Sequence, residues 1–594
     1  MKTTVFLMIL CLMFVSVAGA AAPAAPAGLQ AESINAGTVD LTWKDKSANE
    51  TGFKIYRKTG GGAWTLLDDT GQNVKSYSDT KATNNTTTKV YSYNIKACNA
   101  SGCSPATETA VVPFKPSALK ATVSSATRVD LKWIDKSSNE TAFLIERKAG
   151  TCATAGAWAQ IKSASAGTEA AADSTVTGGK TYSYRVRAKA QSAAPVATGF
   201  SGYSNCSSAN TPAVSLPKTG QKKCYNSKGA VIACAGTGQD GELKKGVPWP
   251  NPRFTTTYCN ASGTCADQSA DCDADASTDI VTDNLTGLVW TRDADKPAAD
   301  MEWQEALTYA NALSLCGYSD WRLPNKNELF SLVDFSANDP ALQPGHPFVN
   351  VLNTIHWTSN TSSDNPLKAM TVSIFHGGSI WDYAKDTNWS VFPVRGSSSG
   401  GIIKLPKTGQ TTCYNATGDV KACSGTGQDG ELKKGVAWPN PRFAITYCNA
   451  SGPCADQTAD CDADASTDVI MDRLTGLIWS RDGNITGPTT WQEALTSANS
   501  SSLCGFRDWR LSNVIELESL ANYEENTAAW LNSSGFINVG SGMWDSYYSS
   551  TTSQSNNSNT LCIVFGPPTS WGHLNHCNKS GMMTWRSWQV RGSM

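Results

Sequence analysis

The sequence predicts a multidomain protein: two all-β sandwiches followed by two disulfide-rich domains that combine strands with helices. Two internal repeats carry this prediction. A short repeat returns after 90 residues and shows the alternating apolar and polar residues of half-buried strands. A long repeat returns after 189 residues with cysteines at matching positions, which indicates a duplicated domain rather than a short-period solenoid.

The first twenty residues have the pattern of a secretory signal peptide. Lys2 supplies a basic start, residues 5–17 are apolar, and Ala18-Gly19-Ala20 is typical of a cleavage site. The apolar run is too short for a spanning helix, and no later segment is long enough to cross a bilayer. We therefore expect residues 1–20 to be removed and the protein to be exported without membrane insertion. The medium, the cell surface and the periplasm remain alternative destinations.

Two similar segments follow the signal peptide. The alternating strand around Trp43 returns around Trp133, and each segment holds that one tryptophan at a core position. Short alternating strands separated by turn residues predict an all-β sandwich. Both segments resemble fibronectin type III domains, which are immunoglobulin-like sandwiches. We expect them at residues 25–112 and 114–212, where they would serve as a rigid spacer.

The long repeats span residues 214–396 and 403–594, joined by a Ser- and Gly-rich linker. Without Cys11 of the signal peptide, 18 cysteines remain, an even number that predicts disulfide bonds in an exported protein. Their grouping predicts the pairs Cys98 with Cys103, Cys152 with Cys206, and Cys562 with Cys577. The six matched cysteines of each long repeat leave fifteen pairings open. Zinc is the alternative, but the sequence lacks C-x-x-C pairs at zinc-ribbon spacing.

Each long repeat shows a change of pattern along its length. The polar, Gly-rich stretch 241–254 predicts strands and turns rather than helix. A helical pattern begins at Trp303 and runs to Leu313, and the capping-box pair Asn325 and Glu328 predicts a second helix. The remaining C-terminal stretch is strand-like and rich in Trp, Ser and Asn.

Both long repeats are acidic. Residues 214–396 contain 14 Lys and Arg against 20 Asp and Glu, and residues 403–594 contain 13 against 17. This balance argues against a nucleic-acid partner. It also argues against simple electrostatic capture of sulfated polymers, which would need bridging calcium or a local basic patch such as Lys244-Lys245 or Lys433-Lys434.

Three stretches of the repeats carry a resemblance to a known family. They are residues 282–290, the Trp303 helix leading into Trp321-Arg322-Leu323-Pro324-Asn325, and residues 548–552 before the closing Val590-Arg591. Together they resemble the Lcl C-terminal domain of bacterial collagen-like adhesins. The resemblance implies a compact α+β, C-type-lectin-like fold and attachment to sulfated glycans and host surfaces. The chain departs from the family in lacking a collagenous stretch, in the cysteine-rich first half of each repeat, and in Ser512, which replaces the motif's proline.

The motifs argue against an enzymatic role. The same succession also resembles formylglycine-generating oxidases, which need a reactive cysteine pair near the closing strand. Pro393 and Gln589 occupy that stretch here. His573 and His576 have no glutamate that would complete a zinc-protease motif. We therefore expect no catalytic residues, although paired carboxylates of a glycosidase would be invisible in the sequence.

A series of aspartates offers candidate calcium ligands, because carboxylates at alternate positions let a loop wrap oxygens around the ion. The EF-hand pattern does not fit, since Ala276 stands where glycine is needed and Thr282 where glutamate is needed. The alternative is a solvated acidic turn beside a disulfide. The candidate ligands are Asp271, Asp273, Asp275, Asp279 and Asp283, with Asp460, Asp462, Asp464, Asp468 and Asp472 in the second repeat.

The tryptophans fall into two groups. Those that coincide between the repeats beside apolar residues are expected in the core, namely Trp290, Trp303, Trp321, Trp479, Trp491 and Trp509. Those among Asn, Ser and Asp in the divergent C-terminal halves are candidate sugar-binding residues, because an exposed indole offers a flat apolar face to a sugar ring. These ligand-binding candidates are Trp381, Trp389, Trp571, Trp585 and Trp588.

The sequence thus predicts an exported, disulfide-stabilised bacterial protein whose tandem lectin-like domains attach to a glycan or another surface polymer. Two weak sites on one chain would gain avidity where both can engage. One alternative is a structural or assembly component of the envelope or an appendage that binds protein partners. A second is an enzyme that acts on polysaccharides.

Overall fold

The computed structural model describes most of the 594 residues. The residues outside the description are 1–20, 36, 83–89, 108–109, 126–127, 192–196, 353, 376–377, 399, 455–458, 543–544, 567–572, 581–583 and 593–594. The predicted signal peptide therefore lies outside the described residues. The chain is multidomain, mostly β with few helices, and divides into two compact units.

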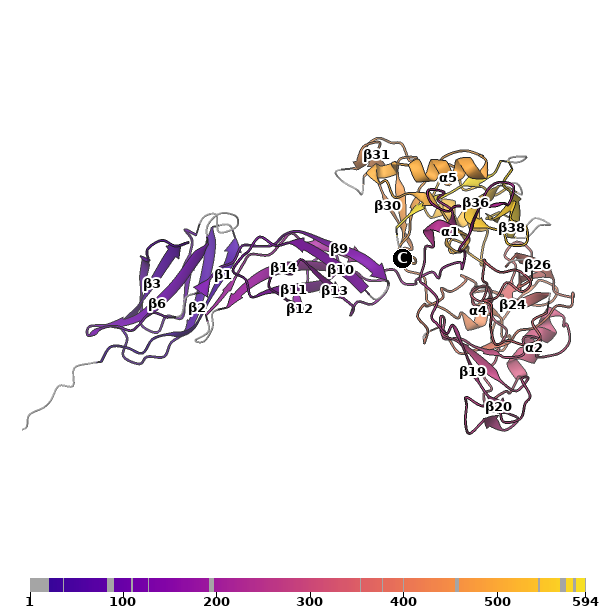
Figure 1. Cartoon of the computed structure of the whole chain (residues 1–594), viewed down its shortest axis with the longest axis horizontal. Helices are drawn as coiled ribbons and strands as arrows, with labels where there is room; N and C mark the ends of the chain where they lie inside the picture. Colours follow the sequence, from indigo (N-terminus) through magenta and orange to yellow (C-terminus); the bar gives the residue numbers. More distant parts are fainter. Residues whose placement is uncertain are drawn as a thin grey trace, which may run out of the picture. The chain divides into compact units, whose positions relative to one another are not determined.

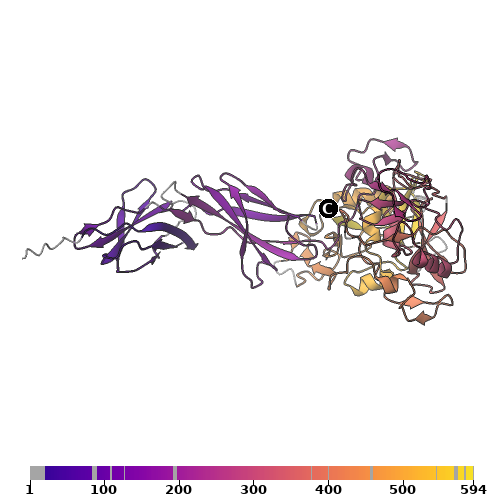
Figure 2. The same ribbon diagram turned by 90° about the horizontal axis from the view of Figure 1, so that it is seen from below.

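The N-terminal unit comprises Met1–Val123, Arg128–Thr175 and Thr181–Ala209 and contains two sandwiches (Figures 1 and 2). In the first, the sheet β1-β2-β5 faces the sheet β4-β3-β6-β7, with β8 on β6. Its strands are β1 Ala27–Asn35, β2 Thr38–Lys44, β3 Gly52–Thr59, β4 Thr65–Gly71, β5 Ser76–Asp79, β6 Tyr91–Asn99, β7 Gly102–Cys103 and β8 Ala110–Val111.

The second sandwich repeats this arrangement. The sheet β13-β10-β9 faces the sheet β12-β11-β14, which β15 and β16 extend, and β15 also pairs in parallel with β1. Its strands are β9 Ser117–Ser125, β10 Arg128–Ile134, β11 Ala142–Ala149, β12 Ala159–Ser165, β13 Ala170–Asp173, β14 Thr181–Gln191, β15 Thr198–Phe200 and β16 Ser207–Asn210.

The two predicted core tryptophans lie between the sheets. Trp43 is 4% exposed and packs against Phe53, with ring centroids 5.6 Å apart. Trp133 is 3% exposed and packs against Phe143 at the same distance. The sequence placed both tryptophans correctly, because alternation along a half-buried strand fixes which side chains face the core.

The C-terminal unit contains both long repeats. Elements of the first are β17 Cys224–Tyr225, β18 Val231–Ile232, α1 Asp240–Leu243, β19 Phe254–Thr257, β20 Cys259–Asn260, β21 Gly263–Thr264, β22 Ile280–Asp283, β23 Val289–Thr291, α2 Trp303–Ala312, α3 Lys326–Phe330, β24 Ile355–Thr361, β25 Lys368–Ser373, β26 Ile380–Ala384 and β27 Val394–Arg395. The sheet β19-β22-β23-β27 joins the beginning of the repeat to its end.

The second repeat follows the same order. Its elements are β28 Cys413–Tyr414, β29 Val420–Lys421, α4 Asp429–Leu432, β30 Phe443–Thr446, β31 Cys448–Asn449, β32 Gly452–Pro453, β33 Val469–Asp472, β34 Ile478–Ser480, α5 Trp491–Ser500, η1 Leu503–Gly505, β35 Arg510–Leu511, α6 Val514–Glu518, α7 Thr527–Ser533, β36 Ser546–Thr552, β37 Asn559–Val564, β38 Leu574–Asn578, β39 Arg586–Ser587 and β40 Gln589–Arg591.

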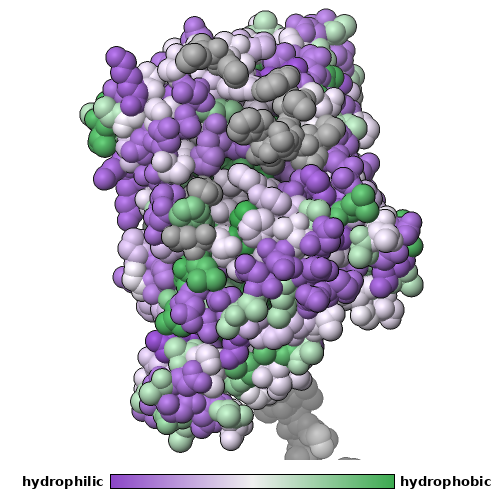
Figure 3. All heavy atoms as spheres, turned by 90° about the vertical axis from the view of Figure 1, so that its right-hand side faces the viewer, coloured by the Kyte–Doolittle hydropathy of each residue, from purple (hydrophilic) through white to green (hydrophobic). Residues whose placement is uncertain are grey.

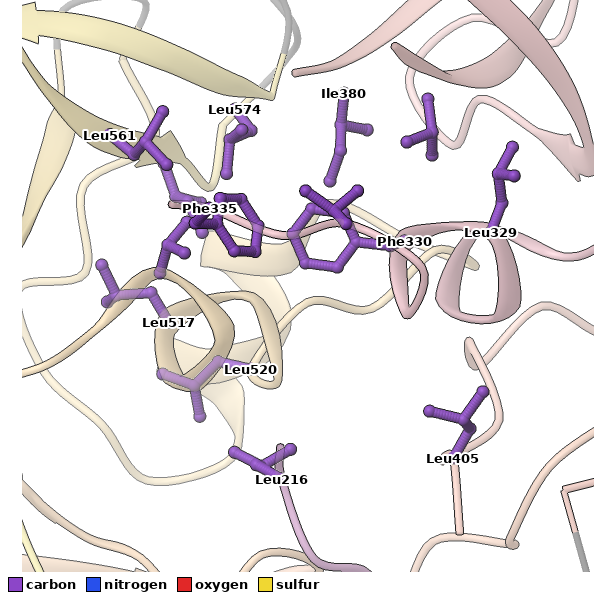
Figure 4. Packing of buried hydrophobic residues seen from close by; sticks show 14 of the residues in the cluster. Leu216, Leu329, Phe330, Phe335, Ile380, Leu405, Leu517, Leu520, Leu561 and Leu574 are labelled. Carbon is purple, nitrogen blue, oxygen red and sulfur yellow. The ribbon is translucent and has the colours of Figure 1, made fainter. Parts of the chain in front are cut away.

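One sheet runs through both repeats in the order β24-β25-β26-β38-β37-β36-β39. Its two halves meet where Ile380 of β26 pairs with Leu574 of β38, and the His573 amide donates to the Ile380 carbonyl at 3.0 Å. Beneath the sheet, buried side chains of both repeats form one continuous core (Figure 4). The repeats therefore share hydrogen bonds and this apolar core, while smaller buried clusters, such as those around α2 and α5, belong to one repeat each.

The repeats also exchange their cysteine-bearing segments, which we call the first arm (residues 219–243) and the second arm (residues 408–432). Helix α1 of the first arm lies beside β36 of the second repeat, and α4 of the second arm lies beside β24 of the first (Figure 1). The Gln410 side chain accepts from the Thr361 amide at 3.0 Å and donates to its carbonyl at 2.8 Å. Gln221 makes the equivalent pair of bonds with Thr552.

The predicted helices are present, with one correction. Helix α2 begins at Trp303, and α3 begins after the capping box in which the Glu328 amide donates to Asn325 Oδ1 at 2.9 Å. Helix α3 is a single short turn of five residues. The pattern of the stretch 241–254 predicts no helix, but Asp240–Leu243 forms α1. Gly241 tolerates no side chain there, because an added Cβ would lie 2.1 Å from the Lys223 carbonyl oxygen.

All 18 described cysteines form disulfides, and the three predicted pairs are confirmed. The pairings that the sequence left open are identical in the two repeats. They are Cys224–Cys234, Cys259–Cys316 and Cys265–Cys272, then Cys413–Cys423, Cys448–Cys504 and Cys454–Cys461. No disulfide joins one repeat to the other among the described residues.

Among the described residues, no helix is both long and apolar enough to cross a membrane. The face of the C-terminal unit seen in Figure 3 is mostly hydrophilic, with hydrophobic residues in small separate spots. The apolar side chains of this unit lie mainly in the shared core.

Candidate functional site

The C-terminal unit has a cleft of about 560 Å³ in the first repeat, at the base of the first arm. Its lining includes three cationic lysines, one tryptophan and several amide side chains. The lining residues are Lys218, Thr219, Gly220, Gln221, Lys222, Lys244, Pro248, Trp249, Pro250, Asn251, Asp334, Ser336, Gln343 and Pro344. We call this the lysine cleft.

Local backbone geometry brings these residues together. Helix α1 ends because Lys244 adopts a left-handed conformation (φ 47°) and its amide donates to the Asp240 carbonyl at 2.8 Å. The chain then turns back, so that the Trp249 indole donates to the Lys218 carbonyl at 3.0 Å. The guanidinium of Arg253 lies 4.5 Å from the Trp249 ring centroid and covers part of the indole.

The charge of the lysine cleft is positive. None of Lys218, Lys222 and Lys244 forms an ion pair with any residue that the structure describes. The carboxylate in the wall, Asp334, is buried and accepts from the Ser336 amide at 2.8 Å and hydroxyl at 2.7 Å. Lysine ammonium groups without an ion-pair partner, beside an indole and amides, suit an anionic ligand that also offers hydrogen-bonding groups.

The second repeat has diverged at this place. Thr411 stands where the first repeat has Lys222, and Glu524 stands where it has Ser336. Glu524 accepts hydrogen bonds from the Thr411 amide and hydroxyl at 2.7 and 2.8 Å. Trp530 of α7 lies 5.2 Å from Trp438, the counterpart of Trp249. The second repeat thus replaces a lysine with a threonine and adds a carboxylate and a second indole.

The tryptophans predicted to bind ligand differ in burial and packing. Trp381 and Trp389 are half-buried and both pack against Tyr383, with ring centroids 5.8 and 4.8 Å from it. Trp585 is half-buried beside the core formed around α5. Trp571 lies outside the described residues.

Trp588 is a correction to the sequence prediction. It is fully buried, its indole donates to the Ser480 carbonyl at 3.0 Å, and it packs against Trp479 and Tyr547. It is therefore a core residue and has no free face for a sugar. The six tryptophans expected in the core are all at most 3% exposed.

The candidate calcium ligands do not gather around one point. Asp279 is buried and binds the Cys259 amide at 2.8 Å and Arg292 at 2.7 Å. Asp283 is buried against Arg253 and Thr286, whereas Asp271, Asp273 and Asp275 are exposed and accept amides of their own loop.

The equivalent aspartates of the second repeat have the same kinds of partner. Asp468 and Asp472 are buried in ion pairs with Arg481 and Arg442, and the carboxylates of Asp460, Asp462 and Asp464 cap turns. Within the described part of the chain, no group of three or more acidic, His or Cys side chains could hold a metal ion. These carboxylates therefore do not fit calcium as they stand, and calcium remains a prediction from sequence alone.

The sequence alone does not indicate the lysine cleft as a site. Lys244-Lys245 stands out as a basic patch, but no local pattern connects Lys218 and Lys222 with it. The pairs Lys222-Lys223 and Lys244-Lys245 were the available signal. The turn at Lys244 and the return of the chain to Trp249 are needed to place their side chains around one cavity.

Comparison with known proteins covers both units. No curated protein matches the chain. The FN1-FN3 domains of chicken CNTN1 share 19% identity over 32% of this chain and 68% of that one, with a TM-score of 0.20. A segment of two fibronectin type III domains from chicken tenascin shares 13% identity over 31% of this chain and 97% of that one, with a TM-score of 0.15.

The model of the Lcl C-terminal domain matches residues 279–395 and 468–591. Each match begins at the buried aspartate just before β22 or β33 and ends at the closing strand, so it leaves out the arms. The C-terminal unit therefore holds two segments in tandem, one in each repeat, that match the model of the Lcl C-terminal domain.

Proposed function

We propose that this chain is an exported adhesion protein that attaches to an anionic glycan or another anionic surface polymer through the lysine cleft. The tandem domains would be α+β and C-type-lectin-like, as the family resemblance implies. Binding rather than catalysis is their role in this proposal. The single observation that supports it most is the set of lysines beside Trp249 that have no ion-pair partner among the described residues, in a cleft large enough for a sugar residue.

The lysine cleft also answers an objection raised by composition. The repeats are acidic overall, so a uniformly charged surface would repel an anionic polymer. Lys218, Lys222 and Lys244 concentrate positive charge in one cleft. There the local electrostatic field would attract an anionic polymer, and the cleft walls would contact it directly. Export is supported by the signal-like N-terminus and by the disulfides that join all the described cysteines, because such bonds form in oxidising compartments.

The test is binding of the full chain to sulfated, carboxylated and neutral polysaccharides, with calcium and then with a chelator. The double variant Lys222→Thr/Lys244→Asn removes two charges from the cleft. Lys223→Thr/Lys245→Asn removes two neighbouring charges that do not line it. We expect the first to weaken binding of an anionic polymer about tenfold, at about 0.7 kcal/mol per lysine, and the second to change it little.

The outcomes separate the alternatives. Equal loss in both variants would indicate diffuse attraction and overturn the cleft as the site. Loss of binding with the chelator would support the calcium prediction. Binding to no polymer would overturn the proposal in favour of a protein partner, and release of reducing ends would do so in favour of an enzyme.

A further inference from the structure

A buried ion pair joins the two repeats. Lys326 of α3 bonds to Glu518 at the end of α6, and Glu518 also accepts from the Tyr523 hydroxyl. All three residues are buried, and the Lys326 ammonium lies 4.8 Å from the centroid of the Tyr523 ring. Lys326 belongs to the first repeat, whereas Glu518 and Tyr523 belong to the second. We call these three residues the polar trio.

The equivalent positions on the other side of the interface are apolar. The repeat step of 188 residues relates Lys326 to Val514, Glu518 to Phe330 and Tyr523 to Phe335. Val514, Phe330 and Phe335 are buried, and the two phenylalanine rings lie 5.5 Å apart (Figure 4). A symmetric duplication has therefore become asymmetric at the place where its halves meet.

This asymmetry decides what each repeat can face. Two first repeats brought together would place each Lys326 against Phe330 and Phe335, with no carboxylate in reach. Two second repeats would place Glu518 and Tyr523 against Val514, with no cation in reach. A buried charge without its partner is strongly unfavourable, whereas a first repeat facing a second pairs both charges.

We propose that the polar trio determines partner choice, so that a first repeat pairs only with a second repeat and never with its own kind. Buried polar groups are known to fix pairing in this way in other assemblies. The partner surface is the sheet edge and arm site already described, which any copy of this chain also carries. When the two repeats of one chain face each other, the pairing surface of each repeat is covered by the other.

The consequence concerns assembly. If like repeats could pair, one chain could join a second through its first repeat and a third through its second repeat. Alternating like pairs of this kind would extend into a polymer. Pairing of unlike repeats can instead close within a chain, where the linker holds the two repeats together, or between two chains that exchange repeats reciprocally. The polar trio therefore excludes assemblies built on like pairs.

The test uses full chains with reversed charges. Lys326→Glu places two carboxylates at the interface, and Glu518→Lys places two ammonium groups there. Each variant alone should lose the compact C-terminal unit, seen as protease sensitivity. Refolded together in equal amounts, the two should form a species of twice the wild-type mass. In that species the first repeat of one variant faces the second repeat of the other, so that one of its two interfaces pairs the introduced carboxylate with the introduced ammonium and the other keeps the native ion pair. No disulfide needs to break for this exchange, because each joins residues of one repeat.

The double variant Lys326→Glu/Glu518→Lys is the control for folding. It restores opposite charges within one chain and should return to the wild-type mass and protease resistance. The proposal is overturned if each single variant stays compact at the wild-type mass, or if mixing yields no double-mass species while the double variant folds. Failure of the double variant to fold would also overturn it, since opposite charges alone would then not determine pairing.

Discussion

The Thr551 hydroxyl of the second repeat donates a 2.8 Å hydrogen bond to the carboxyl of Asp240 in the first arm. Thr219 donates to the same oxygen at 2.6 Å, and burial raises the pKa of Asp240 to about 6. Asp429 of the second arm is buried in the same way beside Thr408 and Asn360, and burial raises its pKa to about 6 as well. Each arm thus docks through a carboxyl whose protonation lowers the cost of burial.

Docking of the arms is therefore expected to depend on pH. The folded-state pKa lies above the unfolded value of about 3.9, so the folded state holds more protons. This contribution to stability is complete below about pH 4 and is lost as pH rises through about 6. We expect Asp240→Asn/Asp429→Asn to gain stability over the wild type at pH 7.5, by up to about 3 kcal/mol per carboxyl. Urea unfolding at pH 4.5 and 7.5 measures it, and an equal difference at both values would contradict the assignment.

A glycine in the first arm tests whether the arm docks on the second repeat. Gly238 has φ +67°, and an added Cβ would lie 1.9 Å from Asn499 Nδ2 in α5. Gly236 has φ +76° with open space around it, so Gly236→Ala carries the backbone strain alone. We expect Gly238→Ala to lower the free energy of unfolding by about 1–3 kcal/mol more than Gly236→Ala. Adding Asn499→Ala should remove most of that excess. If the double variant is as unstable as Gly238→Ala alone, the first arm does not dock against α5.

Disulfides of different span should stabilise the repeats to different degrees. Cys259 and Cys316 are 57 residues apart, whereas Cys224 and Cys234 are 10 apart. Chain entropy predicts that replacing the longer pair with alanines costs about 1.5 kcal/mol more than replacing the shorter pair. Denaturant unfolding of the two double variants gives the comparison. The equivalent pairs of the second repeat, 56 and 10 residues apart, should show the same order.

Trp588 and Trp381, which the sequence analysis places in one group, should differ in how much stability is lost when each is truncated to alanine. Trp588→Ala leaves a cavity among buried aromatic rings and should lower the free energy of unfolding by about 3–5 kcal/mol. Trp381→Ala removes a half-buried ring at the edge of an aromatic group and should cost clearly less. Thermal or urea unfolding of both variants decides, and equal losses would place Trp381 in the core as well.

Local patterns in the sequence were sufficient wherever one element determines the outcome. Strand alternation placed Trp43 and Trp133, and the capping box placed the start of α3, because these depend on neighbouring residues. Polar neighbours made Trp588 resemble a surface residue, although its ring lies between Trp479 and Tyr547. A single residue between two polar ones carries too little periodicity to reveal its face.

Features shared between the repeats could not be derived from local pattern. The two arms have similar sequences, so neither sequence indicates on which repeat its arm docks. The lysine cleft depends on the left-handed Lys244 and on Trp249, which connect lysines that are distant along the chain. The contrast between Lys222 and Thr411 was visible in the sequence, but it gains meaning only when both are placed beside Ser336 and Glu524.

The junction of β26 with β38 has a consequence for how the gene can change. Recombination between tandem copies ordinarily shortens a duplicated gene to one copy. Here a single remaining repeat would expose the unpaired edge of a strand and the apolar surface around Ile380 and Leu574, both of which promote aggregation. Loss of either copy would therefore leave a defective product, and the duplication resists reversal once the two halves have come to depend on each other.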